Sequence, residues 1–119
     1  MIDLGCGFGG PIRQLVSEYN CRGIALNASS LELEAMAKTN EAEGLGNRIR
    51  PLEGNYEDIP LGDAEVDIAW SQEAFLHCGD RAQLMREVFR ILKPGGEFIF
   101  VDPTTTADRE VIPWRCDAA

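Results

Sequence analysis

The feature that most constrains this chain is a glycine-rich turn that lies close to its first residue. The segment reads D-L-G-C-G-F-G-G over residues 3–10, between a short apolar run and a segment with helical spacing. Glycine has no Cβ, so a strand that ends in glycines can turn sharply into a helix and expose its main chain to a ligand. The turn therefore predicts a strand over residues 1–6 and a helix over residues 11–19, with a ligand bound between them.

The helix after the turn gives a second reason to expect a polar or anionic ligand. Pro11 stands in its first turn, where a missing N–H is tolerated, and the positive end of the helix dipole faces the glycines. A polar group of a nucleotide-like ligand binds readily at such an end. Gly5, Gly7 and Gly10 also satisfy the dinucleotide fingerprint G-x-G-x-x-G, so the turn alone leaves two cofactor classes open.

The end of the next expected strand helps to separate these two classes. Sites for NAD place an acidic residue there, about 20 residues beyond the turn, to bind the ribose hydroxyls. Here residues 21–27 read C-R-G-I-A-L-N, with Ala25 at the expected position and the uncharged Asn27 two residues later. The missing acid disfavours NAD, although a contact between Arg22 and the 2′-phosphate of NADP stays open.

Apolar runs of strand length alternate with helical segments along the chain, which predicts one α/β domain. We expect a Rossmann-like parallel sheet with strand order 3-2-1-4-5 and helices on both faces. The expected strands are residues 1–6, 23–26, 49–53, 66–71 and 97–101. The expected helices are residues 11–19, 29–44 and 80–93. The last helix is expected to bury Leu84, Val88, Phe89, Ile91 and Leu92 on one side.

Composition excludes several classes of function. The net charge of −9 and the pI near 4.5 argue against a nucleic-acid groove and against docking on an anionic membrane. No leader and no apolar run of roughly 18 residues is visible, so we expect a cytoplasmic protein with a small-molecule substrate. The chain has four cysteines that form no C-x-x-C pair, Cys6, Cys21, Cys78 and Cys116, and its one histidine is His77. We therefore expect free thiols and no metal.

Three segments together resemble the class I S-adenosylmethionine-dependent methyltransferases. They are D-L-G-C-G-F-G-G at residues 3–10, G-N-Y-E-D-I-P at residues 54–60 and L-K-P-G-G-E-F at residues 92–98. The resemblance covers residues 1–108, which we interpret as an incomplete core that binds S-adenosylmethionine. Residues 109–119 are a tail to which the sequence assigns no element.

Within that family the sequence is most similar to the sarcosine/dimethylglycine N-methyltransferases of betaine synthesis. The similarity lies in A-L-N at residues 25–27, W-S-Q-E-A-F-L-H at residues 70–77 and V-D-P at residues 101–103. The expected reaction is therefore methyl transfer to a small-molecule amine. Tocopherol and phosphoethanolamine methyltransferases share several of these features, so a quinol, tocopherol or phosphoethanolamine-type acceptor is the alternative.

The resemblance also implies a set of residues that bind the cofactor. They are Asp3, Gly5, Cys6, Gly7, Gly9, Gly10, Arg13, Leu26, Asn27, Asn55, Tyr56, Ser71 and Gln72. The main chain at Gly5 and Gly7 would lie against the methionine part of the cofactor. Leu26 and Asn27 would flank the ribose, and Asn55 with the main chain of Tyr56 would meet the adenine.

Two charged residues of this set have a structural alternative. Asp3 would lie near the ammonium group of the cofactor, or it would instead hold the glycine turn by accepting its N–H groups. Arg13 would meet the carboxylate of the cofactor or of the substrate, or it would be a solvated helix arginine. Asn55 could likewise serve only as a turn residue.

Gln72, Glu73 and His77 are the candidate catalytic residues. Gln72 would face the transferred methyl group, while Ser71 or Gln72 would present a carbonyl to the ammonium. Glu73 and His77 could accept a proton or hold the amine, although a lone histidine is more often structural. Methylation of a neutral amine is a direct displacement, so alignment and exclusion of water matter more than a strong base.

The sequence leaves two further interpretations open. Related enzymes place helices ahead of the first strand and further strands after the fifth, so this chain would be a cofactor-binding fragment without turnover. The fifth strand would then be an exposed edge through which the chain could self-associate. The other interpretation is an NAD(P)-binding domain of an oxidoreductase.

Overall fold

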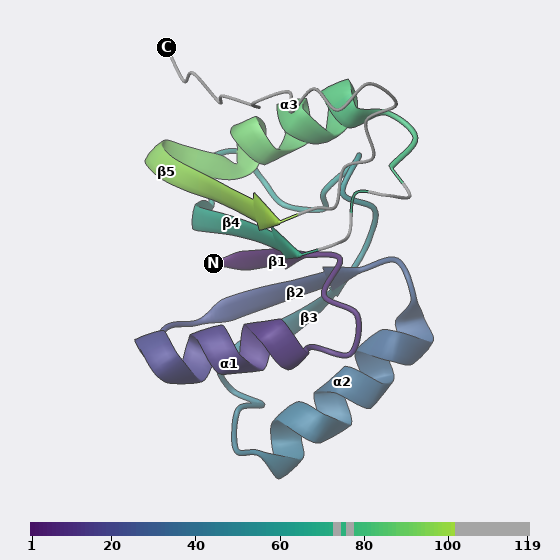
Figure 1. The fold of residues 1–119 in the computed structure, drawn as a ribbon, viewed down its shortest axis with the longest axis vertical. Helices are drawn as coiled ribbons and strands as arrows, with labels where there is room; N and C mark the ends of the chain where they lie inside the picture. Colours follow the sequence, from purple (N-terminus) through teal and green to yellow (C-terminus); the bar gives the residue numbers. More distant parts are fainter. Residues whose placement is uncertain (73–74, 76–77, 102–119) are drawn as a thin grey trace, which may run out of the picture.

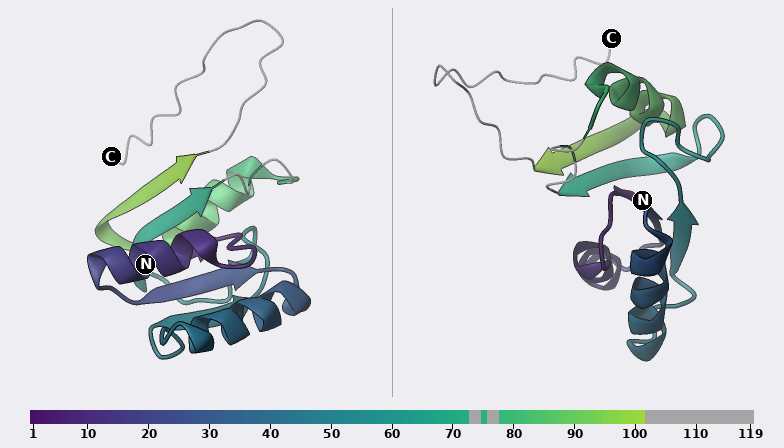
Figure 2. Two further views of the ribbon diagram at one scale, coloured as in Figure 1. Left: turned by 60° about the horizontal axis from the view of Figure 1, so that its bottom comes forward. Right: turned by 90° about the vertical axis from the view of Figure 1, so that its right-hand side faces the viewer.

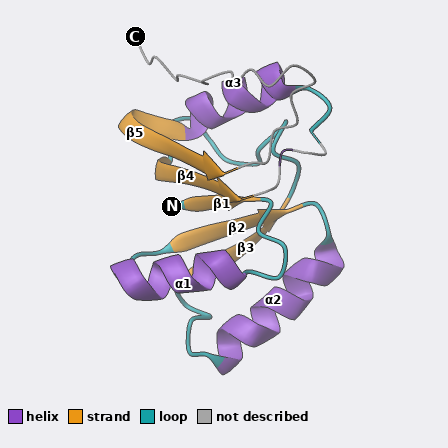
Figure 3. Ribbon diagram, viewed as in Figure 1, coloured by secondary structure: helices purple, strands orange, loops and turns teal. Residues whose placement is uncertain are grey.

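The computed structural model describes residues 1–72, 75 and 78–101, and it confirms the expected α/β fold (Figure 1). Its elements are β1 (Ile2–Leu4), α1 (Gly10–Tyr19), β2 (Gly23–Asn27), α2 (Ser30–Ala42), β3 (Ile49–Glu53), β4 (Val66–Gln72), α3 (Arg81–Ile91) and β5 (Leu92–Val101). The strands pair in parallel in the order β3-β2-β1-β4-β5, as the sequence predicts (Figure 3). None of the helices in this described part is long and apolar enough to cross a membrane.

Two buried clusters hold the helices to the sheet. Successive side chains of a strand point to opposite faces, so Leu26 joins one cluster and Ala25 joins the other. The α3 residues Leu84, Val88 and Ile91 belong to the first cluster, and residues of α1 and α2 belong to the second. α1 and α2 accordingly lie beside the β2–β3 half of the sheet, and α3 lies beside the β4–β5 half (Figure 2).

Each helix begins at a residue suited to that position. Pro11 stands in the first turn of α1, as predicted, and the cap residue Gly9 has a φ of 83°. Ser29 accepts a hydrogen bond from the Glu32 N–H at 3.3 Å, which is half of a capping box. At the start of α3, Asp80 accepts one from the Gln83 N–H at 3.0 Å. These caps fix where the chain leaves the ligand edge of the sheet.

The expected bounds differ from the structure most clearly at the end of β1 and where α3 passes into β5. β1 ends at Leu4 and not at residue 6, because Gly5 takes a φ of 78° and turns the chain. α3 ends at Ile91, two residues before its expected end, because Lys93 precedes Pro94 and that position disfavours helical geometry. The strand β5 therefore starts at Leu92 and not at residue 97, where Leu92 pairs with Val66.

Burial on α3 also differs from the prediction at two residues. Leu84, Val88 and Ile91 are buried as expected, since their spacing keeps them on one side of the helix. Phe89 is one position past Val88, which turns its side chain away from the sheet and leaves it 65% exposed. Leu92 is half-buried in β5 and not on the helix.

The packing of the glycine turn against α2 leads to a first prediction. A Cβ at Gly9 would overlap the side chains of Met36 and Arg13, and the residue has a left-handed φ of 83°. Gly44 has a similar φ of 73°, but a Cβ added there would meet no atom within 4 Å. We expect Gly9→Ala to lower the free energy of unfolding by about 2–3 kcal/mol, and Gly44→Ala by about 1 kcal/mol.

Urea denaturation of both variants measures this difference. Equal losses for Gly9→Ala and Gly44→Ala would mean that backbone strain alone governs both positions and that the contact with Met36 is unimportant.

Candidate functional site

A pocket of about 220 Å³ opens where β1, β2 and β3 end. Its lining residues are Gly5, Leu26, Asn27, Ala28, Gly54, Asn55, Tyr56, Glu57 and Gly79. They come from four separate parts of the chain, which the parallel sheet brings to one edge. The structure therefore gathers five of the predicted cofactor residues, Gly5, Leu26, Asn27, Asn55 and Tyr56, around one pocket.

The glycine turn presents bare main chain beside this pocket. Gly5 and Cys6 both donate their N–H groups to the Leu26 carbonyl at 2.9 Å, which joins the turn to the end of β2. A Cβ at Gly7 or Gly10 would meet no atom within 4 Å. The space in front of these two glycines is open, so a ligand can approach the main chain there.

Asn27 is held in place by an acid that the sequence pattern did not reveal. Its Nδ2 donates to Glu32 Oε2 at 2.6 Å and to the Gly7 carbonyl at 3.3 Å, and its Oδ1 accepts from the Ser29 N–H at 3.1 Å. The second strand ends without an acid, but the first turn of α2 brings the Glu32 carboxylate to the same place. The signal was present in the pair Ser29 and Glu32, which sequence reasoning interpreted only as a capping box.

Asn55 and Tyr56 occupy the side of the pocket formed by the loop after β3. Asn55 Oδ1 accepts from the Glu57 N–H at 2.9 Å, so its side chain stabilises the turn. The ring of Tyr56 lies edge-on to Phe75, with their centroids 5.9 Å apart. These contacts hold the main chain of this loop in place. The expected adenine contact of Asn55 stays a prediction.

Glu57 connects this loop to the start of α3. Its Oε1 accepts from the Asp80 N–H at 2.7 Å and from the Cys78 thiol at 3.2 Å. These two hydrogen bonds, the Asp80 amide first, hold the pKa of Glu57 below its ordinary value. Sequence reasoning missed Glu57 because its partners lie more than 20 residues away.

The family is decided by comparison with known proteins. The sequence profile of a family described as "Methyltransferase domain" matches residues 2–100. The chain belongs to the class I S-adenosylmethionine-dependent methyltransferases. This assignment answers the question that the glycine turn left open, because the cofactor of the family is S-adenosylmethionine and not NAD(P).

Three relatives show which members of this family the chain is similar to. It is 41% identical to a sarcosine/dimethylglycine N-methyltransferase of Halorhodospira halochloris, over 91% of this chain and 39% of the relative. It is 44% identical to a glycine/sarcosine/dimethylglycine N-methyltransferase of Actinopolyspora halophila, over 87% of this chain and 18% of the relative. The crystal structure of a protein from Galdieria sulphuraria, assigned as a sarcosine dimethylglycine methyltransferase, gives a TM-score of 0.83 and 35% identity, over 85% of this chain and 38% of that one. The methyltransferase chain thus spans less than two fifths of these relatives.

Asp3 is a buried acid in β1, and its expected contact with the ammonium group of S-adenosylmethionine stays a prediction. It immediately precedes Leu4 and the glycine turn, and it is only 2% exposed. Within the described ranges no residue gives its carboxylate a hydrogen bond or an ion pair, and burial raises its pKa from 3.8 to about 7. The N–H groups of Gly5 and Cys6 bond to Leu26 and not to Asp3, so the alternative in which Asp3 holds the turn finds no support. A buried carboxylate beside open glycines fits a ligand that brings its own positive charge.

The structure places Arg13 and Cys6 of the methyltransferase in packing roles. Arg13 donates from Nη1 to the Phe8 carbonyl at 2.7 Å and to Asn40 Oδ1 at 3.1 Å, and its Nε lies 3.3 Å from Glu43. Arg13 thus ties the glycine turn to α2. Burial raises the pKa of Cys6 to about 12, so its thiol stays protonated. Their expected contacts with the cofactor stay predictions.

The end of β4 carries the remaining predicted residues. Ser71 is buried and donates to the Leu4 carbonyl at 3.2 Å, which joins β4 to β1 where the glycine turn begins. Gln72 is exposed at the last position of β4. Glu73 and His77 lie outside the described residues, so their proposed parts in catalysis stay predictions. β4 therefore brings Gln72 to the same edge of the sheet as the pocket.

The burial of Asp3 leads to a second prediction about the stability of the methyltransferase. The folded state keeps a proton on Asp3 up to about pH 7, whereas an unfolded chain releases it near pH 4. Stability from this group is complete below about pH 4 and is lost as the pH rises to about 7. We expect this loss to reach about 4 kcal/mol, and we expect Asp3→Asn to remove it.

Chemical denaturation at pH 4.5 and pH 8 measures the change for each protein. Asp67→Asn removes an exposed carboxylate of β4 and controls for the loss of one charge. If Asp3→Asn kept the pH dependence of the unsubstituted chain, Asp3 would be ionised in the folded state and would have a partner.

Proposed function

We propose that this chain is the cofactor-binding core of a methyltransferase that acts on a small-molecule amine of the sarcosine or dimethylglycine type. The observation that carries the proposal is the 41–44% identity to two N-methyltransferases whose names give these acceptors. The arrangement of Asp3, the glycine turn and Asn27 around one sheet edge supports the cofactor part. The acceptor is inferred from the relatives alone.

Each end of the cofactor has candidate contacts in this site. S-adenosylmethionine supplies a methyl group on a positively charged sulfur. The carboxylate of Asp3 binds the ammonium group, and the open main chain at Gly5 and Gly7 accommodates the methionine part. Asn27, held by Glu32, meets the ribose. The loop of Asn55 and Tyr56 contacts the adenine, as its place in the pocket supports.

The reaction needs alignment more than acid–base chemistry. A neutral amine attacks the methyl carbon, the bond to sulfur breaks, and the nitrogen becomes positively charged. Gln72 at the end of β4 would orient the amine beside the methyl group and help to exclude water. Glu73 and His77 would hold the amine or take up its proton if it arrives protonated.

The third prediction concerns cofactor choice. Calorimetric titration should give binding with S-adenosylmethionine and no heat with NADH. Gly7→Leu should abolish the binding, because its side chain would fill the open space in front of the turn. Gly95→Leu is the matched control, since Gly95 has a left-handed φ of 82° and open space but lies on β5 away from the pocket.

The controls separate the possible causes of lost binding. Both glycines have a left-handed φ, so both variants strain the backbone, and loss in Gly7→Leu alone assigns the effect to the site. Tight binding of NADH, or full affinity of Gly7→Leu for S-adenosylmethionine, would contradict the proposed site.

The fourth prediction concerns the acceptor. Methyl transfer is measured with glycine, sarcosine, dimethylglycine, phosphoethanolamine and a phenolic quinol, in the presence of S-adenosylmethionine. We expect product with sarcosine or dimethylglycine and none with the quinol. Methylation of the quinol alone would overturn the amine assignment, and binding of the cofactor without any turnover would favour the cofactor-binding fragment.

A further inference from the structure

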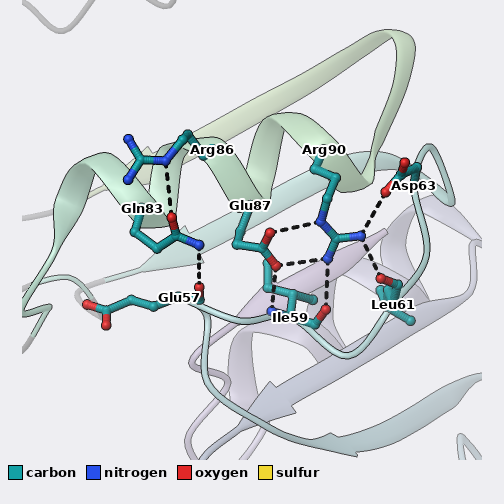
Figure 4. Close-up of polar contacts among 8 residues, drawn as sticks. All are labelled: Glu57, Ile59, Leu61, Asp63, Gln83, Arg86, Glu87 and Arg90. Carbon is teal, nitrogen blue, oxygen red and sulfur yellow. Dashed lines mark hydrogen bonds and ion pairs between the residues drawn. The ribbon is translucent and has the colours of Figure 1, made fainter.

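One face of α3 binds the main chain of the loop between β3 and β4 (Figure 4). Gln83, Glu87 and Arg90 follow each other at intervals of four and three residues, so they share one side of the helix. Their partners lie at every second position of the loop. We call these three residues the α3 ladder.

The contacts of the α3 ladder run in order along the loop. Gln83 donates from Nε2 to the Glu57 carbonyl at 3.0 Å. Glu87 accepts the Ile59 N–H at 2.8 Å, and Arg90 donates to the Ile59 carbonyl at 2.9 Å. Both main-chain groups of Ile59 are therefore bound by one ion pair.

Arg90 extends the α3 ladder to the end of the loop. Its Nη1 donates to the Leu61 carbonyl at 2.8 Å and to Asp63 Oδ1 at 3.0 Å. The same guanidinium makes two bonds of 2.8 Å to the carboxylate of Glu87, which is 8% exposed. Such paired geometry fixes both side chains, and loss of one partner would leave the other charge poorly compensated.

The loop depends on these contacts for its shape. It belongs to no helix or strand, and apart from bonds within the loop, from the Asp58 N–H to the Asn55 carbonyl and from the Leu61 N–H to the Ile59 carbonyl, its main-chain groups need partners from elsewhere. Ile59 is 2% exposed and anchors the loop in the core, while Asn55 and Tyr56 of the same loop line the pocket. The position of the pocket wall is thus set from α3 through Ile59.

We propose that the α3 ladder positions the adenine-binding wall of the cofactor site and so sets the preference for adenine over other bases. The ladder residues do not line the pocket, and they act through the main chain at residues 57–61. This inference rests on the proposed function, because it takes the pocket wall at Asn55 and Tyr56 as the adenine contact.

The test compares two ligands that differ only in the base. S-adenosylhomocysteine carries adenine, and S-inosylhomocysteine carries hypoxanthine, with a carbonyl in place of the amine. The readout is the base ratio, the dissociation constant of S-inosylhomocysteine divided by that of S-adenosylhomocysteine. We expect this ratio to be above one for the unsubstituted chain, and we expect Glu87→Ala to reduce it by roughly tenfold. Gln83→Ala removes one neutral hydrogen bond to the loop, together with an exposed bond from Arg86 that does not touch the loop, and should reduce the ratio by about threefold.

The ratio separates positioning from simple destabilisation. A variant that only lowers the folded fraction weakens both ligands equally and leaves the ratio unchanged. Lys93→Ala is the matched control, because it breaks an ion pair with Asp67 near the same helix without touching the loop. Glu87→Gln keeps an acceptor for the Ile59 N–H and should restore part of the preference. If Glu87→Ala does not fold, the ratio measured for Gln83→Ala tests the inference.

Amide hydrogen exchange of the free chain supplies a readout that needs no ligand. Glu87→Ala should expose the Ile59 amide to exchange, and Lys93→Ala should not. An unchanged base ratio in a folded ladder variant, or full protection of Ile59 in Glu87→Ala, would overturn the inference. Failure of the unsubstituted chain to bind S-adenosylhomocysteine would overturn the proposed function and this inference with it, even if the exchange result held.

Discussion

The carbonyl of Leu26 determines how the ligand edge of this sheet is built. It accepts two main-chain hydrogen bonds, from Gly5 and Cys6, just where β1 ends and the glycine turn begins. Those bonds bring the turn against the end of β2, and they allow Asn27 to reach the Gly7 carbonyl. The turn, the second strand and the first turn of α2 are consequently joined by hydrogen bonds into one corner. The loop after β3 joins this corner through a bond from the Gly54 N–H to the Asn27 carbonyl.

Sequence patterns predicted the fold well where local chemistry determines it. The bounds of β3, Ile49–Glu53, agree with the prediction, and the first turns of all three helices carry recognisable caps or prolines. The start of β5 was missed because Pro94 and two following glycines usually interrupt regular structure. Here the strand continues through them with a register shift opposite residues 66–68, and only pairing with β4 could reveal that.

The site was predictable in its motifs and not in its supports. Glycines and Asn27 could be placed because their spacing follows directly from a strand, a turn and a helix. Glu57 and the α3 ladder act on main-chain groups that lie up to 31 residues away, and no local pattern encodes those pairings. Glu32 acts on the side-chain amide of Asn27, a contact that its capping-box spacing does not show. The pocket is therefore shaped largely by polar and charged residues that a sequence pattern would assign to the solvent.

The buried carboxylate of Asp3 would give the protein a stability that depends on its ligand, if it binds the ammonium group as proposed. Near neutral pH this group opposes folding when it is ionised without a partner. A ligand cation that binds only the folded chain would remove that penalty and add its own binding free energy. The same residue would then make the free protein less stable against unfolding than the liganded protein. Cellular abundance of such a chain would follow the supply of its cofactor, because proteolysis acts mainly on the unfolded fraction.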